Sequence, residues 1–339
     1  MLKSLFSIIF ILVSSLSFAN EVNIYTSRHY DSDDQLYEDF RKETGIKINV
    51  ISGNGNALLE RLKSEGKNSP ADIFFTVDAG NLWKIQKEGY FQSISSSKAL
   101  SVVPINLIGP NNEWIAIAKR ARVIFYNPKT VSDEELIDLS YENLSSDEWN
   151  GRVVIRSSSN IYNQSLVASL ISTHGIEQTE EWAKGFVSNL ARKPQGNDRS
   201  QIMAVANGLA DLAIANSYYY GYMLSGKAGN DQVKAAKKVK MFFPNQNTRG
   251  VHINISGLGI LKNAKNIDNA NRFIEFLLSR EMQSNMVNNS FEYPVLSDVS
   301  PHPDIASSGL GFLEDKMKVS EYGKFNSEAI KLMDRAGWK

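Results

Sequence analysis

Apolar residues along the first third of the chain are spaced as in alternating strands and helices. Segments 21–27, 46–51 and 71–75 have the apolar patterns of strands. A helical pattern begins at Asp33 and ends at Gly45, a residue type that commonly ends helices. Strands that alternate with helices predict an α/β fold with a largely parallel sheet. Ligands of such sheets bind at the carboxyl ends of the strands.

A second α/β unit is expected further along the chain, whose 339 residues are enough for two domains. Two strand-like runs at 114–118 and 123–126 favour a crossover between the domains. The second unit has a strand at 152–155 and a helix at 200–207. The alternating segment 251–261 is expected to return the chain to the first unit.

Charge and composition narrow the possible partners and sites. Lys plus Arg and Asp plus Glu balance at 37 each, which argues against a nucleic-acid partner held by overall charge. The chain has no cysteine, which excludes disulfides, thiolate metal sites and thiol catalysis. Because 13 tyrosines stand against 4 histidines, oxygen ligands from tyrosine and carboxylate are expected in any metal site.

A run of tyrosines follows one of the predicted strands. Segment 211–215 has the pattern of a buried strand, Asn216 is a good helix N-cap, and Tyr218 and Tyr219 would lie in the first helical turn. The backbone N–H groups and the partial positive charge of a helix start favour ionised phenols there. Two adjacent phenols can also approach one small object from two sides. The alternative is an aromatic patch under a loop.

Other candidate site residues fall on loops or at helix starts. They are His29, Tyr30, Arg122 and Tyr162, and they would meet Tyr218 and Tyr219 if two lobes close on each other. Phenolate is a hard oxygen donor, so clustered tyrosinates select Fe(III) over Fe(II). Four phenolates and Fe(III) leave one negative charge, which Arg122 would offset. Taken singly, each of these residues has an ordinary structural explanation.

Motifs for catalysis and for other ligands are weak or missing. The sequence contains no Gly-x-Ser-x-Gly elbow, no His-Glu-x-x-His and no Walker motif. The run Ser157–Ser159 with Arg122 could instead bind a small oxyanion, which makes an oxyanion-binding protein one alternative. A secreted enzyme is the other. The basic stretch 234–240 is interpreted as a solvated face.

The N-terminus has the pattern of a secretory signal peptide. Lys3 precedes a short apolar core at 5–16, and Ser17-Phe18-Ala19 places small residues where a signal peptidase reads. Cleavage is expected after Ala19, so residues 1–19 would be absent from the mature chain. The alternative is a retained anchor, although the apolar run is short for a membrane span.

Five motifs give the chain a resemblance to a known family. It resembles the bacterial ferric-iron-binding proteins of ABC importers, two-lobed periplasmic solute-binding proteins, and among them the FutA type. The matching motifs span the mature chain: Asn23-Ile24-Tyr25-Thr26-Ser27-Arg28-His29-Tyr30, Ser69-Pro70-Ala71-Asp72-Ile73-Phe74-Phe75-Thr76, Arg120-Ala121-Arg122-Val123-Ile124-Phe125-Tyr126, Asn216-Ser217-Tyr218-Tyr219 and Phe291-Glu292-Tyr293-Pro294-Val295.

The resemblance implies a role for each candidate residue. Tyr218 and Tyr219 match the paired tyrosine ligands, and Tyr30 and Tyr162 match the additional ligands of the FutA type. Three further positions match a histidine that ligates in some relatives, an arginine beside the metal and an asparagine that lines the site: His29, Arg122 and Asn216. Relatives that need a synergistic anion have a glutamate where this chain has Val77, so an anion-dependent site is not expected.

The resemblance therefore implies a periplasmic Fe(III)-binding protein that hands iron to an inner-membrane ABC permease and catalyses nothing. A monomer without a nucleic-acid partner is expected. Crossover strands would join an N-terminal lobe of residues 20–122 and 250–300 to a C-terminal lobe of residues 123–249 and 301–339.

Overall fold

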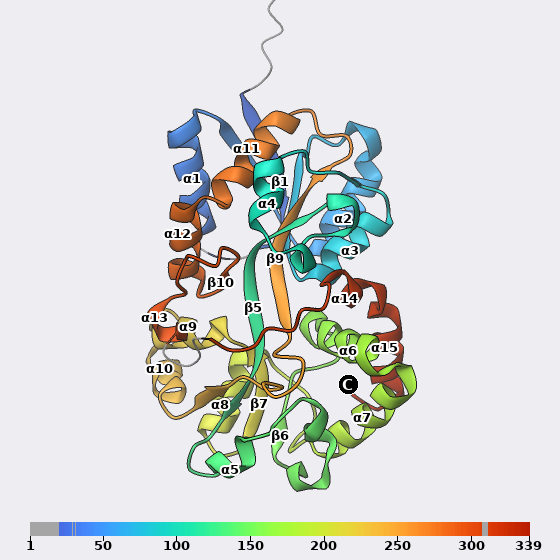
Figure 1. The fold of residues 1–339 in the computed structure, drawn as a ribbon, viewed down its shortest axis with the longest axis vertical. Helices are drawn as coiled ribbons and strands as arrows, with labels where there is room; N and C mark the ends of the chain where they lie inside the picture. Colours follow the sequence, from blue (N-terminus) through green and yellow to red (C-terminus); the bar gives the residue numbers. More distant parts are fainter. Residues whose placement is uncertain (1–19, 29, 31, 307–310) are drawn as a thin grey trace, which may run out of the picture.

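The computed structural model describes residues 20–339 except 29, 31 and 307–310. Two α/β lobes share one curved sheet (Figure 1). The hydrogen-bonded path through this sheet has the order β2-β1-β3-β9-β5-β7-β6. The predicted two-lobed α/β fold is confirmed.

The upper lobe in Figure 1 contains the three strands at the start of the described chain. β1 pairs in parallel with both β2 and β3, as alternating strands and helices predict. The strands span Glu21–Thr26 (β1), Lys47–Ser52 (β2) and Ile73–Val77 (β3). The helices of this lobe are α1 (Asp33–Thr44), α2 (Gly55–Glu65), α3 (Ala79–Lys87), α4 (Ser97–Val102), α11 (Ile267–Leu277) and α12 (Arg280–Ser290).

Two long antiparallel strands run from one lobe into the other (Figure 1). They are β5 (Ile115–Tyr126) and β9 (Ile253–Leu261). The expectation of two separate strands at 114–118 and 123–126 was wrong, because one strand covers both. Its central Arg120 and Arg122 are only 1% exposed. Ion pairs with Glu292 and Asp198 let these charged residues continue a buried strand.

The lower lobe is built around the far half of β5. There β5 pairs with β7 (Leu212–Asn216) and β8 (Lys240–Phe242), and β7 pairs in parallel with the short β6 (Val153–Val154). The helices are α5 (Asp133–Leu136), α6 (Ile161–His174), α7 (Ile176–Ser188), α8 (Asp198–Ala206), α9 (Tyr218–Leu224) and α10 (Asn230–Ala236). The remaining short elements are β4 (Phe91–Gln92), β10 (Tyr293–Pro294) and α13 (Pro303–Ala306).

The C-terminal segment packs where the two lobes meet. α14 (Ser320–Lys324) contacts both α3 and α6, and α15 (Asn326–Arg335) packs on α6 and α7 (Figure 1). The fully buried Trp338 donates a hydrogen bond from Nε1 to the carbonyl of Arg156 at 3.1 Å. The tail thus supports the loop that leads into α6. None of the helices described is both long and apolar enough to cross a membrane.

Candidate metal centre

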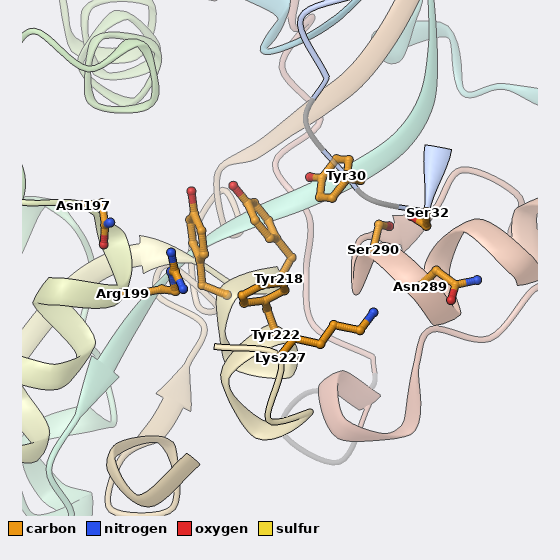
Figure 2. Close-up of a pocket in the computed structure, with 10 residues that line it drawn as sticks. Tyr30, Ser32, Asn197, Arg199, Tyr218, Tyr222, Lys227, Asn289 and Ser290 are labelled. Atoms are coloured by element: carbon orange, nitrogen blue, oxygen red, sulfur yellow. The ribbon is translucent and has the colours of Figure 1, made fainter. Parts of the chain in front are cut away.

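Three tyrosines from both lobes lie in ring contact. The Tyr30 ring, on the loop after β1, meets the Tyr218 ring edge-on with centroids 6.1 Å apart. Tyr219 is next to Tyr218, with ring centroids 4.2 Å apart. In Figure 2 the hydroxyl of Tyr30 points toward Tyr218. The structure therefore brings these three predicted site residues together.

Tyr162 joins the same cluster through a shared arginine. It is the second residue of α6 and is 7% exposed. The guanidinium of Arg120 lies 5.8 Å from the centroid of the Tyr162 ring and 5.4 Å from that of Tyr218. All four predicted tyrosines thus gather at one place. The fifth predicted ligand, His29, lies outside the described residues.

The strand that precedes the tyrosine pair ends one residue later than expected. Asn216 is the last residue of β7, and Ser217 takes the N-cap position of α9. The expectation that Asn216 caps the helix was wrong, because its side chain is used elsewhere. Its Oδ1 accepts a hydrogen bond from Arg122 Nη1 at 3.1 Å. Asn216 therefore lies beside the cluster, as a site-lining residue would.

Arg122 lies beside the tyrosines, but its charge already has a partner. Its Nη1 donates to Asp198 Oδ2 at 2.7 Å, and its Nη2 donates to Asn163 Oδ1 at 2.6 Å. The guanidinium carbon is 5.9 Å from the centroid of the Tyr162 ring. Sequence reasoning missed Asp198, because the helix was expected to begin two residues later. The acidic residue at its true start was the available signal.

A second buried ion network lies under Tyr30. Glu292 is fully buried and accepts hydrogen bonds from Arg120 at 2.7 Å and from Arg28 at 3.4 Å. Arg28 also pairs with Asp33 and lies 4.5 Å over the Tyr30 ring. Burial raises the pKa of Glu292, but the guanidinium groups of Arg120 and Arg28 outweigh this effect and lower it. The sequence analysis had used these residues only as motif support.

The ion networks around the tyrosines carry a net positive charge. Arg156 completes the set, since its Nη1 lies 3.4 Å from Asp198 Oδ1 and its guanidinium is 5.8 Å from the Tyr162 ring. Four guanidinium groups then face three carboxylates, which leaves one positive charge. The cations are Arg28, Arg120, Arg122 and Arg156, and the anions are Asp33, Asp198 and Glu292.

Burial keeps the phenols of the cluster protonated. It raises the pKa of Tyr30 and of Tyr218 well above the usual value of 10, and it also raises the pKa of Tyr219. The Tyr218 hydroxyl is buried and has no hydrogen-bond partner among the described residues. Such an orphaned polar group is costly unless something else binds it. A cation that draws off the protons and binds the oxygens would satisfy this arrangement.

A cavity of about 200 Å³ opens in front of these phenols (Figure 2). No acidic side chain lines it; the lining residues are Tyr30, Ser32, Asn197, Arg199, Tyr218, Tyr219, Tyr222, Lys227, Asn289 and Ser290. Within the described part of the chain, no three His, Asp or Glu side chains are grouped to hold a metal ion. Any metal site among these residues therefore relies on tyrosine oxygens.

Comparisons with known proteins place the chain in a family. Residues 68–308 match the bacterial extracellular solute-binding proteins. The chain is 50% identical to iron uptake protein A1 of Synechocystis, over 94% of its own length and 88% of the relative's. The chain belongs to the bacterial extracellular solute-binding proteins.

Solved structures of this family share the fold. FutA of Trichodesmium, solved with iron and citrate ligands, superposes with a TM-score of 0.90 at 52% identity, covering 94% of this chain and 100% of that chain. A ferric-binding protein of Campylobacter jejuni gives a TM-score of 0.87 at 38% identity, with coverage of 94% and 100%. The solute-binding fold expected from the resemblance is thus confirmed.

Proposed function

We propose that this chain is a periplasmic Fe(III)-binding protein that delivers iron to an ABC permease and catalyses no reaction. The convergence of four buried tyrosines from two lobes carries this proposal. Relatives over nearly the whole chain are named for iron uptake and ferric iron binding. Fe(III) is a hard cation, and phenolate oxygen is a hard donor.

The proposed ligands are Tyr30, Tyr162, Tyr218 and Tyr219. Tyr30 comes from one lobe and the other three come from the second lobe, so ligation joins the lobes. His29 is adjacent to Tyr30 in the chain and is proposed as a possible fifth ligand. Arg122 and Asn216 would hold the surroundings of the metal rather than the metal itself.

The charge of the surroundings matches the oxidised metal. Four tyrosinates and Fe(III) carry one negative charge, and the ion networks carry one positive charge. Reduction to Fe(II) would add an uncompensated negative charge in a buried site, which is costly. The site should therefore favour Fe(III). The four arginines together supply the balance, in place of Arg122 alone.

The oxyanion alternative finds little support at the site. Asp198 already occupies Arg122, and it also accepts hydrogen bonds from Arg156 and from the backbone N–H of Asn216. In the turn that precedes α6, the Ser157 and Ser159 hydroxyls contact each other at 3.1 Å. A free oxyanion would have to compete with the Asp198 carboxylate for these donors.

Members of the family are extracellular, and we extend this to a periplasmic location for the mature chain. The signal pattern at residues 1–19, with cleavage after Ala19, supports export. We infer a monomeric carrier with ferric iron as cargo, an inner-membrane permease as partner and no nucleic-acid partner.

Metal competition tests this function. The mature chain is incubated with equimolar Fe(III), Mn(II) and Zn(II), freed of unbound metal and analysed for metal content. The proposal predicts that Fe(III) is retained at about one ion per chain. Equal retention of Zn(II) or Mn(II), or retention of no metal, would contradict it.

A further inference from the structure

The first turn of α6, which carries Tyr162, is tied to a different part of the molecule at each of its next three residues. Asn163 accepts from Arg122 on the crossover strand β5. The side chain of Gln164 accepts from Asn326 of α15 at 3.0 Å. Ser165 donates to Asp78 in the opposite lobe at 2.7 Å. The last of these contacts joins the two lobes directly.

Asp78 is a buried carboxylate that is used fully by three donors. It is 0% exposed and lies at the N-cap of α3. Gly80 N donates to its Oδ1 at 2.8 Å, and Asn254 Nδ2 on the crossover strand β9 donates to its Oδ2 at 2.9 Å. The carboxylate therefore connects α3, β9 and α6 at one point.

The backbone of Asp78 is held in an uncommon conformation. Its φ is +75°, a region that residues other than glycine rarely adopt. Such conformations persist where the surroundings over-determine them, and they are frequent at functional sites. The side chain of Asn254 secures the same turn, because its Oδ1 accepts from Ala79 N at 2.9 Å. The strained turn aims the Asp78 carboxylate at the first turn of α6.

The two helices are in close contact at this point. A Cβ atom on Gly80 would lie 3.4 Å from Ile161 Cδ1 and 3.6 Å from Ser165 Oγ, so α3 begins directly against the start of α6. Figure 1 shows α3 of the upper lobe above α6 of the lower lobe, with α14 beside both. Ser165 lies three residues after Tyr162, which is close to one helical turn.

We propose that Asp78 and Ser165 are positioning residues that lock α6 to the opposite lobe and thereby hold Tyr162 in place when the lobes are closed around the metal. This inference rests on the proposed ferric function. The hydrogen bond to a buried carboxylate stabilises the closed, loaded protein, in which Tyr30 and Tyr162 must meet. Its loss should therefore speed the release of iron more than it slows iron capture.

The test compares Ser165→Ala with Ser169→Ala. Ser169 is a matched control, because it is also 0% exposed and lies one turn later on α6, but its hydroxyl donates within the helix to the Leu166 carbonyl. Iron release is followed by loss of visible absorbance after mixing with excess chelator. Ser165→Ala is expected to release iron about tenfold faster than both wild type and Ser169→Ala, the size of effect typical for a hydrogen bond to a charged group.

Two further measurements separate positioning from simple structural support. The melting temperature of the iron-loaded Ser165→Ala protein should fall while that of the metal-free protein stays the same. Asp78→Asn combined with Ser165→Ala should release iron no faster than the more affected single variant, because both remove one contact. Equal melting losses in the loaded and free proteins, or release rates equal to Ser169→Ala, would overturn the inference. A wild-type protein that takes up no iron would instead contradict the proposed function.

Discussion

Arg122 Nη1 lies 2.7 Å from Asp198 Oδ2, and neither side chain is more than 1% exposed. Asp198 also accepts from the backbone N–H of Asn216, two residues before the first tyrosine of the pair. The ion pair thus fixes the end of β7 and the start of the tyrosine helix. It is held beside the tyrosines without adding net charge.

Changing either member of this pair should move the iron potential in opposite directions. Arg122→Gln leaves a buried negative charge beside the tyrosinates, which weakens Fe(II) binding more than Fe(III) binding, so the potential should fall. Asp198→Asn leaves a positive charge that favours the reduced cluster, so the potential should rise. Breaking a buried pair costs about 3–5 kcal/mol of stability, so folding is checked by circular dichroism. Spectroelectrochemical titration decides the matter, and shifts of the same sign in both variants would refute the electrostatic role.

The paired tyrosines can be tested with a control from the same helix. Tyr218→Phe and Tyr219→Phe remove only the donor oxygens, and each should lower Fe(III) affinity by more than about 100-fold, beyond the loss typical of a supporting residue. Tyr220→Phe should keep wild-type affinity, because the Tyr220 ring packs on Phe125 in the hydrophobic core. Competition with a chelator of known affinity measures all three. An equal loss in Tyr220→Phe would show that the effect is not ligation.

Loading should not depend on an added oxyanion. Val77, where anion-dependent relatives have a glutamate, is an apolar residue at the end of β3, and Asp198 occupies the nearby arginines. We therefore expect the same Fe(III) stoichiometry in anion-depleted buffer as with carbonate or phosphate present. Titrations under both conditions test this. If iron is bound only after an oxyanion is supplied, the assignment of four tyrosine ligands is incomplete.

His252 should make the fold sensitive to acid. It is 1% exposed on the crossover, and its ring nitrogens have no hydrogen-bond partner among the described residues. Burial, together with the positive charges of Arg249 and Arg122, lowers its pKa well below the usual 6.5. The unfolded chain therefore binds a proton there that the folded chain does not. Below about pH 6.5, the free energy of unfolding should fall by up to about 1.4 kcal/mol per pH unit.

His252→Phe tests this pH dependence. The phenyl ring can keep the contact with Tyr322, whose ring centroid is 4.6 Å away, while the titrating group is lost. The variant should lose less stability than wild type between about pH 6.5 and about pH 4.5. Urea unfolding at the two pH values gives the answer. Parallel losses in both proteins would show that another group controls the acid response.

The fold was largely predictable from the sequence, because apolar patterning follows local structure. Gly45 ends α1 as expected, and 251–261 does return to the first lobe as β9. The single strand β5 was missed because Arg120 and Arg122 read as a polar break. Only tertiary partners that come from distant segments explain why two arginines lie in a buried strand.

The tyrosines of the site were predictable, but their electrostatic surroundings were not. Tyr218 and Tyr219 stand out in the sequence as adjacent phenols at a helix start. Glu292 and Asp198 do not, because a carboxylate gives no local signal of the arginine it will meet in space. The sequence therefore assigned the whole counter-charge to Arg122, whereas the structure distributes it over two ion networks.

A visible-absorbance titration of residues 20–339 with Fe(III) tests the central claim most directly, because phenolate bound to Fe(III) gives a strong charge-transfer band. The account predicts a band that grows to saturation at one Fe(III) per chain. It also predicts that the band weakens in each Phe variant of Tyr30, Tyr162, Tyr218 and Tyr219, and is unchanged in Tyr220→Phe. Saturation without a visible band, or a band that survives in all four ligand variants, would contradict tyrosinate ligation of ferric iron.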